Sequence, residues 1–261
     1  MQIATWNVNS IRTRLEQVLA WLDRQGSLDV LCLQETKVVD EDFPRAAFEE
    51  RGFHVEVYGQ KSYNGVALIS RDPLEKVERG FVSLLPSVDH LDEQKRVIGA
   101  IHHGIRILNL YVPNGSEVGS DKYTYKLRWL ARLKNYLTVA LNRGEPMLIC
   151  GDFNIALEDR DIYDPKKAGE IMASEPERQA LREILALGFQ DAFRKFTGDS
   201  GYFSWWDYRS GGFQRNRGWR IDHHYLTADL YEKANACWID VEPRRAEKPS
   251  DHTPVIVALQ A

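Results

Sequence analysis

Polar residues that can do chemistry follow a short apolar run near the middle of the chain. Residues 147–150 read Met-Leu-Ile-Cys, Gly151 comes next, and Asp152 and Asn154 follow two positions apart. Such a run predicts a buried strand, and glycine lets the backbone turn or approach a neighbour. Because α/β sheets carry their chemistry where strands end, Asp152 and Asn154 are candidate site residues. On its own the segment also fits an Asx-type turn.

Polar side chains border four further apolar runs. They are Asn7 after residues 3–6, Glu35 shortly after residues 29–33, Asn114 shortly after residues 105–111, and Asp251-His252 before residues 255–259. If these ends converge, they bring carboxylates, carboxamides and one imidazole into a single pocket. Carboxylate and amide oxygens suit Mg²⁺ or Mn²⁺, with waters and a substrate phosphate completing the shell.

Several other chemistries lack their motifs. The three cysteines, Cys32, Cys150 and Cys237, are not at the strand ends and have no metal-type spacing, which disfavours a zinc thiolate site. The chain has no Walker-type glycine-rich phosphate loop and no Gly-x-Ser-x-Gly elbow. A metal-assisted reaction remains the best-supported class.

The elements that must position these residues alternate between strands and helices. Apolar spacing predicts helices at 15–22, 123–141 and 175–187, and strands at 3–6, 29–33, 53–58, 66–70, 97–101, 105–111, 147–150, 221–226 and 255–259. Asn64-Gly65 and His102-His103-Gly104 are the predicted turns of two strand pairs. Residues 201–219 give little regular signal. This order predicts an α/β fold of two packed sheets with helices outside, in one domain over residues 1–261.

Composition limits the partners and the compartment. The chain has 261 residues, a net charge of -4 and a pI near 6.0, so any nucleic-acid surface must be local. No apolar stretch is long enough to span a bilayer, and no signal-like start is present. We therefore expect a cytoplasmic monomer with no membrane partner.

Seven segments together resemble the exonuclease III family of AP endonucleases. They are Asn7-Val8-Asn9, Leu33-Gln34-Glu35-Thr36-Lys37, Asn64-Gly65-Val66-Ala67, Tyr111-Val112-Pro113-Asn114, Gly151-Asp152-Phe153-Asn154, Trp219-Arg220-Ile221-Asp222 and Ser250-Asp251-His252-Thr253-Pro254. They occur in that family's order and spacing over nearly the whole chain. The resemblance implies the DNase I-like endonuclease/exonuclease/phosphatase fold, a four-layered α/β sandwich of two packed mixed β-sheets flanked by helices.

The resemblance also implies a metal site. Glu35 is similar to the family's principal metal-binding carboxylate, with Asn7 and, more distantly, Asp251 as helpers. A second metal site would use Asp152, Asn154 and His252. The implied cofactor is Mg²⁺, with Mn²⁺ able to substitute. The alternative for Glu35 is a surface ion pair with Lys37.

The implied catalytic residues are Tyr111, Asp152, Asn154, Asp222 and His252. Asp152 would orient or deprotonate the attacking water, or protonate the leaving group. His252 would hydrogen-bond the scissile phosphate or act as the base, and Asp222 would fix its tautomer. Asn154 would hold the phosphate or the water, and Tyr111 would place its hydroxyl against the phosphate. His223 and His224 match no family site, and we expect them to be structural.

A local DNA surface is predicted between residues 205 and 221. Arginines suited to phosphates alternate there with aromatic residues suited to stacking: Arg209, Arg215, Arg217, Arg220, Trp205, Trp206, Phe213 and Trp219. For Arg215 and Arg217 a solvated loop is an equal alternative. By resemblance, Trp205, Trp219 and Ile221 would wall the pocket for a flipped abasic sugar, since unstacking costs least where no base pairs. Lys37, Asn64, Asn114 and Arg209 would contact DNA phosphates.

The predicted function is a Mg²⁺-dependent DNA-repair phosphodiesterase acting on double-stranded DNA with abasic sites or 3′ ends. It would cut 5′ to abasic sites, leave a 3′-hydroxyl and trim 3′ ends. When acting on DNA, it would be associated with the nucleoid. The alternatives are a predominantly 3′ exonuclease with weak AP endonuclease activity, a nuclease-silent nucleic-acid-binding regulator, and an enzyme for another phosphoester such as an inositol phosphate or phospholipid. Ser10 replaces a common family glycine, and residues 163–175, including Met172, match no motif, so the balance of activities stays open.

Overall fold

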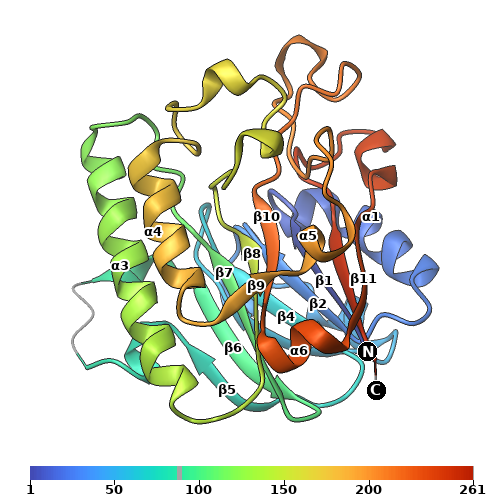
Figure 1. Ribbon diagram of the computed structural model, residues 1–261. Coiled ribbons are helices and arrows are strands. Elements are labelled where there is room, and N and C mark those ends of the chain that lie inside the picture. The colour runs from blue at the N-terminus through green and yellow to red at the C-terminus, as the bar shows by residue number, and fades with distance from the viewer. Residues whose placement is uncertain (87–89, 261) are drawn as a thin grey trace.

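Two six-stranded mixed sheets form the centre of the protein, whose computed structural model describes residues 1–86 and 90–260 (Figure 1). The first sheet has the order β11-β12-β1-β2-β4-β3 and the second has the order β5-β6-β7-β8-β10-β9. The strands of the first sheet are β1 (Gln2–Asn7), β2 (Val30–Gln34), β3 (His54–Tyr58), β4 (Val66–Ser70), β11 (Ala234–Ile239) and β12 (Val255–Leu259). The strands of the second sheet are β5 (Glu75–Arg79), β6 (Val97–His102), β7 (Ile105–Tyr111), β8 (Met147–Asp152), β9 (Phe189–Asp191) and β10 (Asp222–Thr227).

Helices cover the outer faces of the two sheets: α1 (Ile11–Arg24), α2 (Arg45–Glu49), α3 (Asp121–Leu141) and α4 (Glu175–Leu185). The short helices α5 (Ala192–Phe196) and α6 (Ala228–Lys233) pack against the apolar cluster between the sheets. One apolar cluster packs α1 and α2 on the first sheet, a second fills the space between the sheets, and a third packs α3 and α4 on the second sheet. The protein is therefore a four-layered α/β sandwich, as the resemblance predicted.

The strand register gathers the polar strand ends at one end of the sandwich. Parallel β1 and β2 place Asn7 opposite Gln34, one residue before Glu35. Parallel β7 and β8 place Tyr111 opposite Asp152, and antiparallel β10 places Asp222 opposite Asp152 as well. Long loops collect at this end, at the top of Figure 1, while both chain termini lie at the bottom.

All three predicted helices and all nine predicted strands are present, with ends shifted by a few residues. Three strands, β5, β9 and β11, and three short helices, α2, α5 and α6, were not predicted. Strand β5 reads Glu-Lys-Val-Glu-Arg and lies at a sheet edge, where it buries little, so it lacks an apolar pattern. Strand β9 has only three residues.

The prediction that residues 201–219 are irregular agrees with a single 3₁₀ turn there, Arg209–Gly211. No helix within the described residues is long and apolar enough to cross a membrane.

Candidate active site

Three buried side chains meet where β8 ends and β10 begins. His252 Nδ1 lies 2.8 Å from Asp222 Oδ2, and His252 Nε2 lies 3.6 Å from Asp152 Oδ2. Each side chain offers a ligand atom within 4.8 Å of the others. Asp152, Asp222 and His252, predicted from segments far apart in the sequence, therefore form one cluster.

The backbone near the end of β8 requires a glycine at position 151. Gly151 has φ of +139°, and a Cβ placed there would lie 1.9 Å from the Leu110 carbonyl oxygen of neighbouring β7. Asp152 follows, and its Oδ1 accepts the Asn154 backbone N–H at 2.8 Å. The Asx-type turn offered as the alternative reading is thus present, and it fixes the carboxylate that faces His252.

Asn7 connects this cluster to Glu35. The Asn7 amide donates to Glu35 Oε1 and to Asp152 Oδ2, both at 2.9 Å, so it bridges the two carboxylates as a donor. Its Oδ1, the atom that would bind a metal, accepts the Asn9 backbone N–H at 3.0 Å. The ion pair offered as the alternative for Glu35 also exists, since Lys37 Nζ lies 2.9 Å from Glu35 Oε2.

The polar network continues to the predicted sugar pocket. Lys37 donates to Asn9 Oδ1 at 2.6 Å, and Asn9 donates to Asp251 Oδ1 at 3.0 Å. Trp205 Nε1 donates to Asp251 Oδ2 at 3.0 Å. The carboxylates of Glu35 and Asp251, which could bind a metal, and the Trp205 indole of the predicted pocket therefore belong to one hydrogen-bonded network.

Electrostatics give the members of the site different protonation states. Burial raises the pKa of Asp152 to about 7, with the Asp222 charge adding to the effect and His252 opposing it. For His252, burial works against the charged form, but Asp222 and Asp152 outweigh it and raise the pKa to about 10. Burial likewise opposes ionisation of Glu35, yet Lys37 and Asn7 lower its pKa overall. At neutral pH His252 is a cation and Asp152 is poised to exchange a proton.

The donor set fits a divalent cation. Four carboxylates share the site with two basic side chains: Glu35, Asp152, Asp222 and Asp251, with Lys37 and His252. The Asp222 Oδ1 atom is buried and has no hydrogen-bond partner among the described residues. Oxygen ligands with excess negative charge suit a hard dication such as Mg²⁺ or Mn²⁺.

Tyr111, Asn64 and Asn114 line a hollow of about 410 Å³ on one side of this cluster. Burial and the nearby Glu35 raise the pKa of Tyr111 well above its ordinary value, so its hydroxyl stays protonated and can donate. Arg96 lies over the Tyr111 ring at 4.5 Å and lines the same hollow. Asn114 donates to Asn154 Oδ1 at 2.9 Å, which ties the hollow to the cluster.

A second cavity, of about 460 Å³, lies on the other side and has aromatic walls. Trp205 and Trp219 line it as predicted, together with Met172 from the segment that matched no motif. The Trp205 backbone forms isolated β-bridges with both Trp219 and His252, so the cavity adjoins the cluster of Asp152, Asp222 and His252. Ile221, which was also predicted to wall the pocket, is not among the lining residues. It is buried in an apolar cluster that includes Met172 and Trp219.

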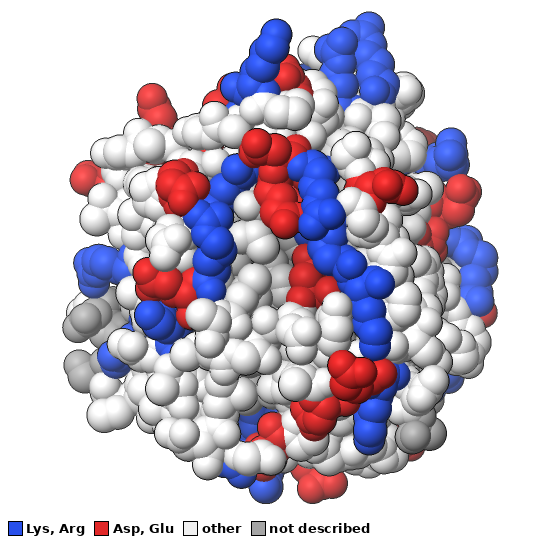
Figure 2. Space-filling view, in the orientation of Figure 1, with Lys and Arg blue, Asp and Glu red and all other residues white. Residues whose placement is uncertain are grey.

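Basic side chains rim this cavity. Arg209, Arg217 and Lys167 line it, and Arg215 is exposed nearby in the sequence. Figure 2 shows Lys and Arg side chains projecting at the top of the molecule, where the loops of Figure 1 gather. Glu170 and Asp207 line the cavity as well, and Lys167 pairs with Glu170 at 3.1 Å, so the rim carries both signs of charge. Contact of its arginines with DNA stays a prediction.

The assignment of Arg220 to the DNA surface was wrong. Arg220 is buried, its Nε donates to Asp161 Oδ1 at 2.7 Å, and its Nη2 donates to Asp191 Oδ2 at 2.8 Å. Burial opposes ionisation of Asp161, but Arg220 outweighs it and lowers the Asp161 pKa to about 2. Residues 208–221 contain no acidic residue, and both partners of Arg220, Asp161 and Asp191, come from segments outside that stretch. Trp206 is likewise a buried core residue.

His223 and His224 are structural, as predicted. His223 Nε2 hydrogen-bonds the Ile155 carbonyl and His224 Nε2 hydrogen-bonds the Val255 carbonyl, each at 2.9 Å. Both rings are fully buried, and burial lowers the pKa of each to about 4, so they stay neutral.

A buried lysine that the sequence reading did not single out supports the site from α3. Lys126 Nζ donates to the backbone carbonyls of Asn114 at 3.1 Å and Asn154 at 2.7 Å, and it pairs with Glu177. Glu177 Oε1 in turn accepts the Met172 backbone N–H at 3.1 Å. A signal existed, because Lys126 falls on the apolar stripe of the predicted helix, where a charge needs a partner.

Comparisons with known proteins agree with this arrangement. Residues 4–252 match the model of the Endonuclease/Exonuclease/phosphatase family. The chain is 36% identical to exodeoxyribonuclease III of Haemophilus influenzae over 268 residues, covering 98% of each protein. It resembles the solved AP endonuclease from Archaeoglobus fulgidus, with 41% identity and a TM-score of 0.93. It also resembles the 3′ phosphatase NExo from Neisseria, solved with a product DNA hairpin, with 39% identity and a TM-score of 0.95. Both likenesses cover 100% of each chain. The chain therefore belongs to the exonuclease III and AP endonuclease family of DNA-repair nucleases, which are phosphodiesterases of the endonuclease/exonuclease/phosphatase superfamily.

Proposed function

We propose that this protein is a Mg²⁺-dependent phosphodiesterase of double-stranded DNA that cuts 5′ to abasic sites, leaves a 3′-hydroxyl and trims 3′ ends. The observation that carries this proposal is the aromatic cavity directly beside His252, joined to it through the Trp205 backbone. A sugar without a base fits between indole walls, whereas extruding a paired nucleotide costs unstacking and unpairing. A phosphate attached to that sugar would lie at the catalytic cluster.

The residues divide the chemistry according to their protonation states. Protonated His252, held by Asp222, donates a hydrogen bond to the scissile phosphate and stabilises its developing charge. Asp152, with a pKa of about 7, exchanges the proton of the attacking water or of the leaving oxygen. Asn154 and Tyr111 position the phosphate. We therefore assign proton transfer to Asp152 rather than to His252, an assignment supported by the Asp152 pKa of about 7.

Glu35 is the principal candidate ligand of the metal ion, with Asp251 as a more distant one. When bound, Mg²⁺ polarises a phosphate oxygen and stabilises the leaving 3′-oxygen. Neutral amide donors such as Asn7 keep the carboxylates in place between turnovers. Lys37, Asn64, Asn114 and Arg209 are proposed contacts to DNA phosphates on either side of the cluster.

The test uses three end-labelled duplexes, each incubated with Mg²⁺ or with EDTA. They carry a stable abasic analogue, a 3′-phosphate, or an undamaged recessed 3′ end. We expect one Mg²⁺-dependent cut immediately 5′ of the analogue, removal of the 3′-phosphate, and slower shortening of the undamaged end. Shortening of ends with the lesion uncut would identify a 3′-trimming enzyme instead. No cleavage of any duplex would refute the proposal.

The second candidate function, 3′ trimming as the main activity, is favoured by one observation. Met172 is buried against Trp219 and narrows the cavity from the segment that matched no motif. A terminal sugar enters such a cavity without bending the duplex on both sides, whereas an internal abasic sugar requires bending. Met172→Ala should therefore raise abasic-site cleavage relative to 3′ trimming if this candidate is correct.

A further inference from the structure

A second cluster of metal-type side chains lies at the opposite end of the second sheet from the catalytic groups. Asp72 lies in the link between β4 and β5, His102 is the last residue of β6, and His103 begins the turn to β7. Each offers a ligand atom within 4.8 Å of the others. Strand β7 runs from this turn to Tyr111 beside the catalytic cluster, about 20 Å away at about 3.3 Å per residue.

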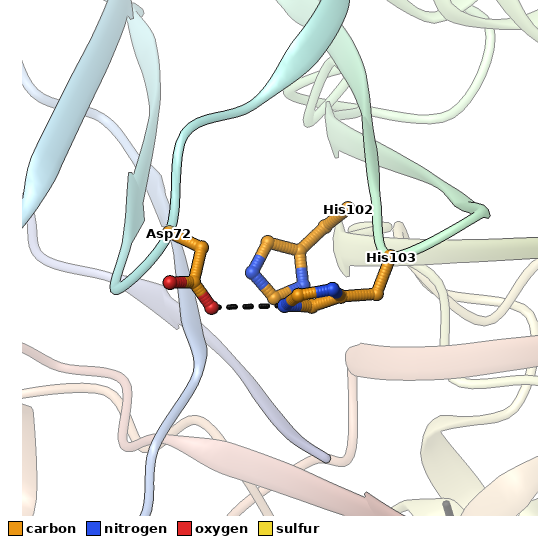
Figure 3. Close-up of side chains that lie close together, drawn as sticks. All are labelled: Asp72, His102 and His103. Atoms are coloured by element: carbon orange, nitrogen blue, oxygen red, sulfur yellow. Dashed lines mark hydrogen bonds and ion pairs between the residues drawn. The ribbon is translucent and has the colours of Figure 1, made fainter.

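The turn geometry lets two successive histidines face one point. Neighbouring side chains of a strand normally point to opposite faces. Here His103 has φ of +48° and Gly104 has φ of +77°, so the chain reverses in a two-residue left-handed turn. The two rings lie 4.3 Å apart between centroids at 81° to each other. Figure 3 shows both imidazoles beside the Asp72 carboxylate, from two separate loops.

His102 lacks the partners that a buried imidazole needs. Its exposed fraction is 1%, and neither ring nitrogen has a hydrogen-bond partner within residues 1–86 and 90–260. Buried polar groups are hydrogen-bonded in the great majority of cases, and an unsatisfied group points to a missing water or ion. Burial and the nearby His103 lower the pKa of His102, which leaves the neutral form that binds metals.

The carboxylate is held toward the histidines by its own loop. Asp72 Oδ2 lies 2.8 Å from His103 Nε2. Ser70 Oγ donates to the Asp72 carbonyl at 2.7 Å, and the Arg71 backbone N–H donates to the Asp29 carbonyl at 2.9 Å. The side chains of Asp72 and His103 are more than half exposed, so an ion can reach them from solvent.

We propose that Asp72, His102 and His103 form a binding site for a borderline transition-metal dication, Zn²⁺ or its analogue Co²⁺, separate from the catalytic site. Two imidazoles and one carboxylate are a common three-ligand set for Zn²⁺, with water as the fourth ligand. Asp72 lies on the link from the first sheet to the second, so the ion joins that link to the β6–β7 turn. Because only the folded chain brings the ligands together, binding stabilises the fold.

The test measures Co²⁺ binding by visible absorption and calorimetry in excess Mg²⁺, which occupies the catalytic site. His103→Asn removes one ligand, and asparagine before glycine suits this turn, so the variant keeps its fold. Asp72→Asn removes the carboxylate with little change of shape. At Co²⁺ concentrations that saturate the unmodified protein, each variant should bind one fewer Co²⁺ per chain. Zn²⁺ should raise the Tm of the unmodified protein but not the Tm of these two variants, and abasic-site cleavage should stay unchanged in both variants.

A matched control is available in His90. It also has a positive φ, +61°, and its Nδ1 lies 2.6 Å from Glu93 Oε1, but the two residues have no third ligand among the described residues. His90→Asn should bind Co²⁺ like the unmodified protein. Equal Co²⁺ stoichiometry and affinity in the unmodified protein and in His103→Asn would overturn the proposal and leave Asp72–His103 as a surface ion pair. An equal loss in His90→Asn would overturn it too, because it would indicate non-specific uptake by histidines.

Discussion

Replacement of Asp222 by asparagine tests how the catalytic histidine is charged. Asp222 is fully buried, and its Oδ2 lies 2.8 Å from His252 Nδ1. An amide keeps the size of the side chain but removes the charge that contributes most to raising the pKa of His252. The protonated form of His252 is then less stable. We expect kcat on an abasic duplex to fall by about 10²- to 10⁴-fold, the range measured for positioned proton-transfer groups. DNA binding should change little, because the Asp222 carboxylate is buried.

The pH profile of kcat separates this role from a structural one. In the unmodified protein we expect activity to rise as Asp152 loses its proton near pH 7 and to fall as His252 loses its proton near pH 10. Removing the Asp222 charge lowers both pKa values, since that charge disfavours ionised Asp152 and favours protonated His252. Both limbs should therefore move to lower pH in Asp222→Asn.

The control is Asp229→Asn, which changes an exposed aspartate just beyond the other end of β10. It should leave kcat and both limbs unchanged. Circular dichroism and Tm of both variants check that the fold is kept. An alkaline limb that stays near pH 10 in Asp222→Asn, with kcat within about threefold of the unmodified protein, would refute the reasoning.

Three further predictions concern the groups around the site. Lys126→Met should reduce the free energy of unfolding by about 3–5 kcal/mol in denaturant titrations, because it leaves the buried Glu177 carboxylate without its cation. A smaller loss in the double variant with Glu177→Gln would confirm the pairing, and additive losses would contradict it. Arg217→Ala should weaken duplex binding and reduce the slope of log K against log salt concentration by about one. Arg215 is outside the cavity lining, so Arg215→Ala should weaken binding less. Equal effects of the two variants would show that the cavity rim does not contact the DNA phosphates. Gly151→Ala should give little folded protein by circular dichroism, because its Cβ would overlap the backbone of β7, and a normally folded, active variant would show that the strands can separate there.

The strand-end residues were predictable because each follows a local signal. An apolar run followed by a polar residue marked Asp152 and Asn7 as candidates. The Asp152 segment alone also fitted an Asx-type turn, and the other polar strand ends of the chain favoured a site, because the packing of two sheets brings such ends together. The four-layer order also followed from the alternation of strand and helix patterns. Edge strand β5 could not be found this way, because a strand that is largely solvent-exposed carries no apolar periodicity.

Residues that depend on distant partners were not predictable from local pattern. Arg220 was predicted to contact phosphates because its sequence neighbours are basic and aromatic. In the fold it instead forms buried ion pairs with Asp161 and Asp191, 59 and 29 residues away. The donor role of Asn7 similarly depends on Glu35 and Asp152 converging on one amide. Composition identifies which side chains can ionise, whereas three-dimensional pairing decides which of them remain available to a substrate.

The two Asp/His clusters at opposite ends of the second sheet contain the same residue types but should select different ions. The cluster around His252 has several carboxylates and a single imidazole whose protonated form is stabilised by the Asp222 and Asp152 charges, and a protonated imidazole is a poor ligand. Its free donors are hard oxygens, which favour Mg²⁺. The distal cluster has one carboxylate for two imidazoles, and the lowered pKa of His102 keeps that ring neutral, so nitrogen donors dominate and favour Zn²⁺. Mg²⁺ in excess should therefore fail to displace Co²⁺ from the distal cluster, while EDTA should remove both ions. The ratio of carboxylates to neutral imidazoles, rather than the presence of aspartate and histidine, would then determine which metal each end of the sheet binds.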